Sequence, residues 1–258
     1  MYFMKKTLIA LAVAASAAVS GSAMAWTANG TGGNVELGGT LTPQEKVTPW
    51  EVQVGAATTN LDGQIQKGTT SVKISSANAI PLLGIRTVNT AAFVGAPGLA
   101  PNISYGNAVN VDKFSDSVAP LTLEVKDAKD VKIGTLKTNV FAQARTSIKG
   151  GDFNGKFWTY SDGPGRGFWG GVPKSAGGVA LVDHTDYMPG VASHYDAQGV
   201  SDTGTPDFST FSNPKSTYSA YYLSVIAPQQ AINISLDAPA AADAIVWKAS
   251  LPVTVSYQ

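Results

Sequence analysis

Residues 247–258 alternate between apolar and polar side chains, and this pattern restricts what the chain can fold into. The apolar positions are Trp247, Ala249, Leu251, Val253, Val255 and Tyr257. A period of two predicts a β-strand with one face in a core. Pro252 lacks a backbone donor, and sheets accept proline mainly at their edges. The segment is therefore expected to be an edge strand, which is a place where a second chain can pair.

Short strand-like segments recur along the chain and are separated by turn residues. They cover residues 49–54, 71–75, 79–87, 120–127, 131–144, 218–226, 231–238 and 245–258. Such spacing predicts an all-β fold built as an antiparallel sandwich, with little helix. The polar residues between 120–127 and 131–144 predict a hairpin.

Residues 143–217 differ in composition from the rest of the chain. They are rich in glycine and aromatic residues and contain both histidines, His184 and His194. Long loops inside a compact domain are usually functional or disordered. We therefore expect an inserted, loop-rich subdomain here, with a hairpin turn at Asn154-Gly155.

The first residues of the chain have the composition of an export signal. Two lysines precede an apolar run that begins at Leu8, and residues 23–25 form a small-residue cleavage motif. The apolar run is shorter than the ~20 residues that a membrane span needs, so cleavage before Trp26 is expected in preference to a membrane anchor. Residues 1–25 are thus predicted to be a signal peptide.

Composition excludes one class of partner and one source of stability. Basic and acidic residues are equal in number, 18 each, and form no basic stripe, so nucleic acid is not expected as a partner. The chain has no cysteine, although exported proteins can use disulfides. Its stability is expected to come from packing, from assembly with other chains, or from both.

A second strand pattern lies near the N-terminal end. Its apolar face is formed by Val35, Leu37, Gly39 and Leu41, in a glycine-rich segment. A lone strand of this kind is unstable until it pairs. It can be the first strand of the same sandwich or a strand that pairs with another chain, and the pattern leaves both interpretations open.

Catalysis is not expected from these residues. The chain has two histidines, no cysteine and no serine in a G-x-S-x-G motif. The aspartates of the inserted region, including Asp152, Asp162, Asp183 and Asp186, lie in glycine-rich turns, where aspartate is common for backbone reasons. The spacing of the histidines with Asp183 or Asp186 matches no common metal site. We expect no enzyme activity, no cofactor and no metal.

Carbohydrate binding fits residues 149–195 better, because sugars are bound by aromatic faces and by planar polar groups. Trp158 and Trp169 are the candidates for stacking on a sugar ring. The candidates for contacts with sugar hydroxyl groups are Asp152, Arg166 and His184. In the alternative interpretation, the aromatic residues form the core of the inserted subdomain.

Three segments resemble the major subunits of FaeG-type fimbriae: GGNVELGGTLTPQEKVTPWEVQVG, IPLLGIRT and the C-terminal APAAADAIVWKASLPVTVSYQ. The resemblance implies an incomplete immunoglobulin-like sandwich over residues 45–258, which lacks its last strand. Residues 26–44 would then be a donor-strand extension. The implied donor residues are Val35, Leu37, Gly39 and Leu41, and the implied acceptor edge is Leu251, Val253, Val255 and Tyr257.

The same resemblance implies partners and a location. A periplasmic pilus chaperone would bind the acceptor edge first, and an outer-membrane usher would assemble identical subunits into a cell-surface fimbria. Major subunits of this type are themselves adhesins, so the inserted region is expected to bind a host-cell glycan that contains galactose or N-acetylgalactosamine. The alternative is a purely structural pilin with no receptor site of its own.

Overall fold

The structure, a computed structural model, describes residues 28–31, 34–35, 37–42 and 47–258. The chain divides into two compact units, Met1–Glu45 and Lys46–Gln258. All the strands described below belong to the second unit. The predicted signal peptide, residues 1–25, its cleavage site before Trp26 and parts of the 26–44 extension lie outside the described residues.

The second unit is built almost entirely from β-strands. They are β1 (Trp50–Val54), β2 (Ser71–Ile74), β3 (Ile80–Thr87), β4 (Phe93–Val94), β5 (Pro101–Ser104), β6 (Val118–Lys126), β7 (Lys132–Gly150), β8 (Gly155–Trp158), β9 (Ser216–Ile226), β10 (Ile232–Leu236) and β11 (Thr254–Tyr257). The helices of the described residues are three short 3-10 turns, η1 (Val111–Lys113), η2 (Ala176–Gly178) and η3 (Thr185–Tyr187). All paired strands are antiparallel. The predicted all-β antiparallel fold is confirmed, and it is consistent with an immunoglobulin-like sandwich.

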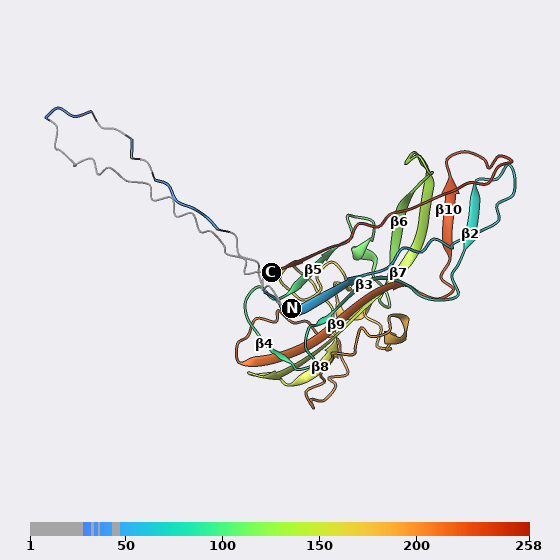
Figure 1. The fold of residues 1–258 in the computed structure, drawn as a ribbon. Coiled ribbons are helices and arrows are strands. Elements are labelled where there is room, and N and C mark those ends of the chain that lie inside the picture. Colours follow the sequence, from blue (N-terminus) through green and yellow to red (C-terminus); the bar gives the residue numbers. More distant parts are fainter. Residues whose placement is uncertain (1–27, 32–33, 36, 43–46) are drawn as a thin grey trace, which may run out of the picture. The chain divides into compact units, whose positions relative to one another are not determined.

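The long strand β7 organises the larger sheet. The sheet runs in the order β1-β3-β9-β7-β10-β2, with β4 on β9 and with β6 and β8 on β7. The first half of β7 pairs with β6 and β10, and its second half pairs with β8 and β9. Figure 1 shows the result: β6, β10 and β2 lie at one end of the unit, and β9, β4 and β8 lie at the other. One strand therefore joins two sets of neighbours.

Strand β7 also crosses the boundary at which the inserted subdomain was expected to begin. It runs past residue 143 to Gly150, and the polar side chains of Gln143, Arg145 and Ser147 within it are buried. Loops of the following segment cover them. The segment between β8 and β9 contributes Phe168 and Phe211 to the main core, where both rings contact Trp50. Its aromatic residues thus pack into the sandwich as well as against one another.

The two expected hairpins both form, but one turn differs from its prediction. Strands β6 and β7 pair around the turn at residues 127–131, as predicted. Strands β7 and β8 pair as well, but the turn is not centred on Asn154-Gly155. The left-handed backbone positions belong to Gly150 (φ +105°) and Gly151 (φ +59°), which glycine adopts without a steric penalty. Asn154 instead closes the turn by accepting a hydrogen bond from the Gly150 N–H, at 3.0 Å.

The smaller sheet pairs β11 with β5. The predicted alternation over residues 247–258 is confirmed, because each apolar side chain is half-buried against the main core and each intervening residue is exposed. The regular ladder is shorter than the alternating segment. It covers Thr254–Tyr257, while Lys248 forms a separate bridge to Lys126 at the end of β6. Pro252 lies between these two paired stretches, where its missing N–H breaks no ladder.

Candidate functional site

The C-terminal strand has one paired edge and one open edge. Ala100 and Gln258 exchange two backbone hydrogen bonds of 3.0 Å. Because hydrogen-bonded and non-hydrogen-bonded pairs alternate along an antiparallel ladder, the backbone groups of Val255 and Tyr257 point away from β5. Within residues 47–258, β11 pairs with β5 alone. The outward-pointing groups therefore form an edge that a further strand can join.

Strand β1 is also an edge strand, and its core-facing side is only partly covered. Trp50, Val52 and Val54 share one face of the strand, because side chains alternate. Trp50 is 6% exposed, whereas Val52 is 41% and Val54 is 61% exposed. The same face therefore begins in the core and ends in solvent. Among the residues that the structure describes, none covers this part of β1 fully.

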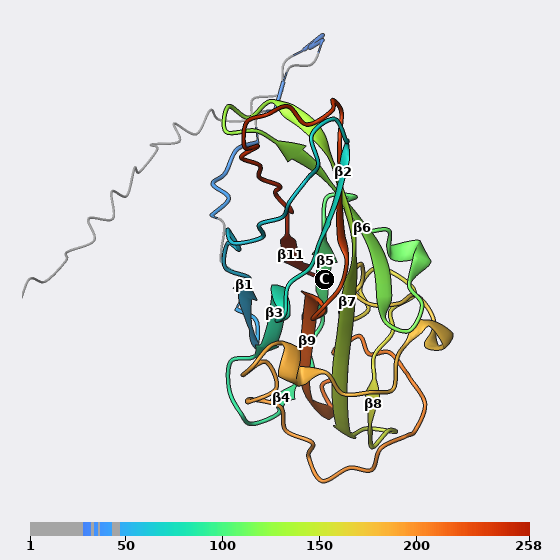
Figure 2. The same cartoon turned by 90° about the vertical axis from the view of Figure 1, so that its right-hand side faces the viewer.

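The two open edges lie close to each other. The indole N–H of Trp50 donates a 2.6 Å hydrogen bond to the carbonyl of Leu99, and the next residue, Ala100, pairs with Gln258. The start of β1 is thus linked to the end of β11 through residues 99 and 100. Figure 1 shows the C-terminal end near the start of β1, and Figure 2 shows it beside β5. We call β1 together with residues 247–257 the open-edge site. The predicted acceptor residues, Leu251, Val253, Val255 and Tyr257, all belong to it.

The predicted donor residues lie in the first unit. Val35, Leu37 and Leu41 are 86%, 93% and 96% exposed, and a side chain added at Gly39 would meet no neighbouring atom within 4 Å. Aliphatic side chains with this exposure gain free energy when they are covered. The apolar side chains of this segment are therefore open to solvent among the described residues.

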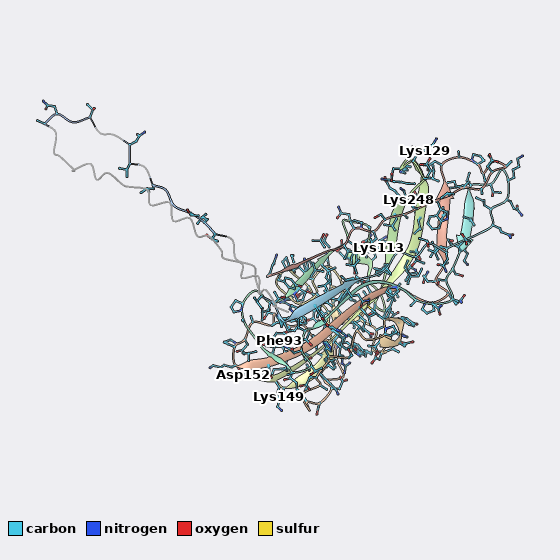
Figure 3. All side chains as sticks on the ribbon, viewed as in Figure 1. Phe93, Lys113, Lys129, Lys149, Asp152 and Lys248 are labelled. Carbon is cyan, nitrogen blue, oxygen red and sulfur yellow. The ribbon has the colours of Figure 1, made fainter. Side chains whose placement is uncertain are left out.

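The five predicted carbohydrate contacts lie in three places. Asp152 is exposed in the turn between β7 and β8, near Lys149, and Figure 3 shows both far from Lys129 and Lys248 at the other end of the sheet. Arg166 and Trp169 share one loop and are joined by a 3.2 Å backbone hydrogen bond. The remaining two residues border one buried cluster. These are Trp158, in β8, and His184.

The structure gives the two tryptophans very different surroundings. Trp158 is only 8% exposed, and the guanidinium of Arg145 lies 4.3 Å from the centre of its ring. Trp169 is half-buried, and the Lys174 ammonium lies 5.1 Å from its ring centre. Lys174 is itself paired with Asp112. Trp169 therefore offers more free ring surface than Trp158.

Two of the three polar candidates, Arg166 and His184, already have partners within the protein. Arg166 forms a 2.5 Å ion pair with Asp162, and its guanidinium lies 3.5 Å above the ring of Phe208. His184 stacks on Tyr187, with ring centres 4.6 Å apart, and meets the ring of Phe141 edge-on at 5.1 Å. Of the five candidates, only Asp152 is fully exposed.

A small cleft beside Trp158 contains residues that the sequence did not suggest. It has a volume of about 160 Å³ and is lined by Trp158, Leu181, Asp202, Gly204 and Thr205. Partial burial alone would raise the pKa of the Asp202 carboxyl, but the Gly204 N–H and the Arg145 guanidinium outweigh burial and hold that pKa below its ordinary value. No sequence signal indicated this ion pair, because Arg145 lies just beyond the strand predicted over residues 131–144 and its partner lies far along the chain.

A second cleft, of about 220 Å³, lies where residues 189–191 meet β1 and β3. Its charged residues are Glu51 and Arg86, which form a 2.5 Å ion pair. In the described part of the chain, no group of three or more acidic or histidine side chains could hold a metal ion. None of the helices in that part has the length and apolar character to cross a membrane.

Comparisons with known proteins show the family of this chain. The sequence model of the family described as "Fimbrial, major and minor subunit" matches residues 4–258. The K88 fimbrial protein AB of Escherichia coli is 32% identical over 197 residues, which cover 69% of this chain and 68% of that protein. The F41 fimbrial protein of Escherichia coli is 29% identical over 281 residues, which cover 98% of this chain and 100% of that protein. The chain therefore belongs to the family of fimbrial major and minor subunits.

Proposed function

We propose that this chain is the major subunit of a fimbria, that it polymerises by donor-strand complementation, and that it also binds host-cell glycans. The observation that carries the assembly proposal is the partly covered apolar face of the open-edge site. In a family of subunits that form filaments, an exposed edge beside an incomplete core is a place for a strand from the next copy. The exposed face of residues 35–41 supplies that strand.

The energetics favour pairing between subunits. Burial of each aliphatic donor side chain contributes about 1.5 to 3 kcal/mol, and each new main-chain hydrogen bond contributes about 1 kcal/mol. Ordering the segment costs about 1 to 2 kcal/mol per residue, so the donor strand alone gains modestly. The larger gain belongs to the receiving subunit, because Val52 and Val54 become part of a closed core. A chain without cysteine then depends on its neighbour for part of its stability.

The backbone of the open-edge site restricts which donor residues can face the core. The backbone groups of Val255 and Tyr257 point toward the place of the missing strand, and their side chains point toward the core. A donor residue opposite them in an antiparallel pair has the same two directions. An alternating segment satisfies this requirement when its apolar residues occupy those positions. The apolar residues of the extension that meet the requirement are Val35, Leu37 and Leu41, with Gly39 between them.

The proposal includes the route to the surface. An uncovered edge invites pairing with wrong chains, so a protein that covers it before assembly is needed. A periplasmic pilus chaperone would bind residues 251–257 first, and an outer-membrane usher would then exchange it for the next subunit. The product is a homopolymer at the cell surface. The signal peptide predicted at residues 1–25 is consistent with this route.

A self-complemented chain tests the assembly proposal. A second copy of residues 26–44, added after Gln258 through a short flexible linker, should occupy the open-edge site and raise the melting temperature. For a domain of this size the rise is about 2 to 4 °C per kcal/mol gained. The matched control carries Leu37→Asp and Leu41→Asp in the added copy only. Equal melting temperatures for the two forms, measured on monomers by calorimetry, would contradict the donor assignment.

The glycan part of the proposal rests on residues 149–195, where aromatic and polar side chains reach the surface. Trp169 is the better stacking candidate, because its ring is only half-buried and lies in one loop with Arg166. Trp158 contributes an edge to the cleft that also contains Asp202. Many weak sites on one filament raise avidity by orders of magnitude without any new contact. The ligand class is a host glycan with galactose or N-acetylgalactosamine.

A glycan array distinguishes this role from that of a purely structural pilin. The assembled filament should bind arrayed glycans that end in galactose or N-acetylgalactosamine, and the self-complemented monomer should bind them more weakly. Trp169→Ala should weaken binding more than Trp158→Ala, after both variants pass a folding check by circular dichroism. Unchanged binding in both variants would exclude these residues as contacts. A filament that binds no glycan and no host cell would favour the structural alternative.

A further inference from the structure

Arg86 connects the edge strand β1 to a loop from a distant part of the chain. Its Nε donates to Glu51 Oε1 on β1 at 2.5 Å. Its Nη1 donates to the carbonyl of Gly190 and to the hydroxyl of Ser193, both at 2.6 Å. Arg86 lies on β3, directly opposite Glu51 in the ladder. One guanidinium therefore holds residues 190–193 against the two strands.

The next residues along β3 and the loop strengthen this connection. His194 Nδ1 lies 2.7 Å from the carbonyl of Thr87, and because a carbonyl only accepts, Nδ1 is the donor. The Thr87 hydroxyl donates in return to the carbonyl of His194 at 3.2 Å. His194 Nδ1 also lies 3.4 Å from Glu51 Oε1. Glu51 is thus approached by both Arg86 and His194.

Packing holds the same loop close to the sheet. Met188 and Val191 are buried in the second apolar cluster. Met188 lies over Gly84 of β3, and a side-chain carbon added at Gly84 would stand 2.8 Å from the Met188 sulfur. A larger residue at position 84 would force the Met188 side chain to shift, so glycine lets Met188 pack directly on β3. We call residues 188–194 the clamped loop.

We propose that the contacts of Glu51 with Arg86 and His194 couple the occupancy of the open-edge site to the order of the clamped loop. This inference rests on the proposed function, since it requires that a donor strand pairs with β1. Glu51 lies on β1 itself, on the face opposite Val52 and Val54. A second partner for β1 holds the backbone of Glu51 in place, and Glu51 in turn holds Arg86 and the loop. The same strand faces the donor on one side and the clamped loop on the other.

The coupling links assembly to the surface that is proposed to contact glycans, because the clamped loop lies within residues 149–195. An edge strand with one partner opens locally at a low free-energy cost, and strand addition raises that cost. The clamped loop shares in the change through its polar contacts with β1. A subunit within a filament therefore presents this loop in a more ordered form than a subunit whose edge is open.

Hydrogen exchange followed by mass spectrometry tests the coupling on the full chain with and without the added copy of residues 26–44. We expect slower exchange at residues 50–54 and, by roughly tenfold or more, at residues 188–194 in the self-complemented chain. In the Arg86→Met variant, exchange at 50–54 should still be slower in the self-complemented chain, and the slowing of exchange at 188–194 should be lost. The matched control is Arg166→Met, which removes a guanidinium that lies over Phe208 and leaves the clamped loop untouched. This control should behave like the unaltered chain.

Each outcome decides between the two proposals. Slower exchange at 50–54 with no change at 188–194 overturns the coupling and leaves the assembly proposal intact. No change at 50–54 contradicts the assembly proposal itself. An unchanged slowing of exchange at 188–194 in Arg86→Met shows that the Arg86 contacts do not carry the coupling. Glu51→Leu removes the acceptor of both Arg86 and His194, and an unchanged slowing of exchange at 188–194 in that variant overturns the coupling, whether or not Arg86→Met folds.

Discussion

Three buried hydroxyl groups at the centre of the sandwich satisfy one another. The hydroxyl of Tyr105 lies 2.6 Å from that of Tyr222 and 2.7 Å from that of Ser224. Tyr222 also donates to the carbonyl of Gly171 at 3.2 Å. A buried polar group without a partner is costly, so the network holds β5, β9 and the loop after β8 in one arrangement.

Removal of one member should destabilise the fold. Tyr105→Phe leaves Tyr222 and Ser224 with one partner fewer, and we expect it to lower the free energy of unfolding by about 1 to 3 kcal/mol. Burial raises the pKa of Tyr105 from its ordinary 10.0 to about 12. The stability that depends on the neutral phenol is therefore full below pH 10 and is lost as the pH rises toward 12.

Urea unfolding at pH 8 and at pH 11 measures both effects. The unaltered chain should lose stability between these pH values, and Tyr105→Phe should lose less, because it has no phenol at this position to ionise. Tyr160→Phe, at a partly exposed position, is the control and should unfold like the unaltered chain. A Tyr105→Phe variant as stable as the unaltered chain at pH 8 would show that the network contributes nothing.

At the scale of elements, alternation predicted the faces of strands better than their ends. The apolar face of residues 247–258 was predictable because polar residues, or Pro252, occupy every second position. The end of β7 was not, because Gln143, Arg145 and Ser147 interrupt the apolar pattern there. Their partners come from loops far along the chain: the Val182 carbonyl, Asp202 and the Asp196 carbonyl. The local sequence pattern cannot show such partners, so the predicted strand ended at residue 144.

The same limit applies to the candidate binding residues. Aromatic residues in a glycine-rich segment were predictable as a group, but their sequence neighbours do not show which of them reach solvent. Phe168 packs against Trp50, which lies in β1, and this contact has no local signal. Arg86 and Glu51 meet only because β1 and β3 pair in one register. The contacts of Arg86 with Gly190 and Ser193 come from a loop more than 100 residues along the chain, for which the sequence pattern predicted no position.

At the scale of the whole molecule, the absence of cysteine makes the interface between subunits directly measurable. Any disulfide in an engineered chain must join the two residues that were introduced. A disulfide forms only when the two Cα atoms lie about 4.4 to 6.8 Å apart. Directly opposite residues on paired antiparallel strands are about 4.5 to 5.5 Å apart, whereas diagonal neighbours are farther away. A cross-link therefore reports both pairing and register.

We expect the cross-links to follow the alternation of the C-terminal strand. Leu37→Cys is combined in one chain with Leu251→Cys, Val253→Cys or Val255→Cys, and oxidised filaments are run on a non-reducing gel. The variant whose second cysteine lies opposite position 37 should give a ladder of covalent multimers. Leu37→Cys with Thr254→Cys is the control and should give none, because the Thr254 side chain lies on the exposed face. A ladder from the Thr254 pair, or none from the other three, would mean that residues 35–41 do not bind the open-edge site with their apolar face toward the core.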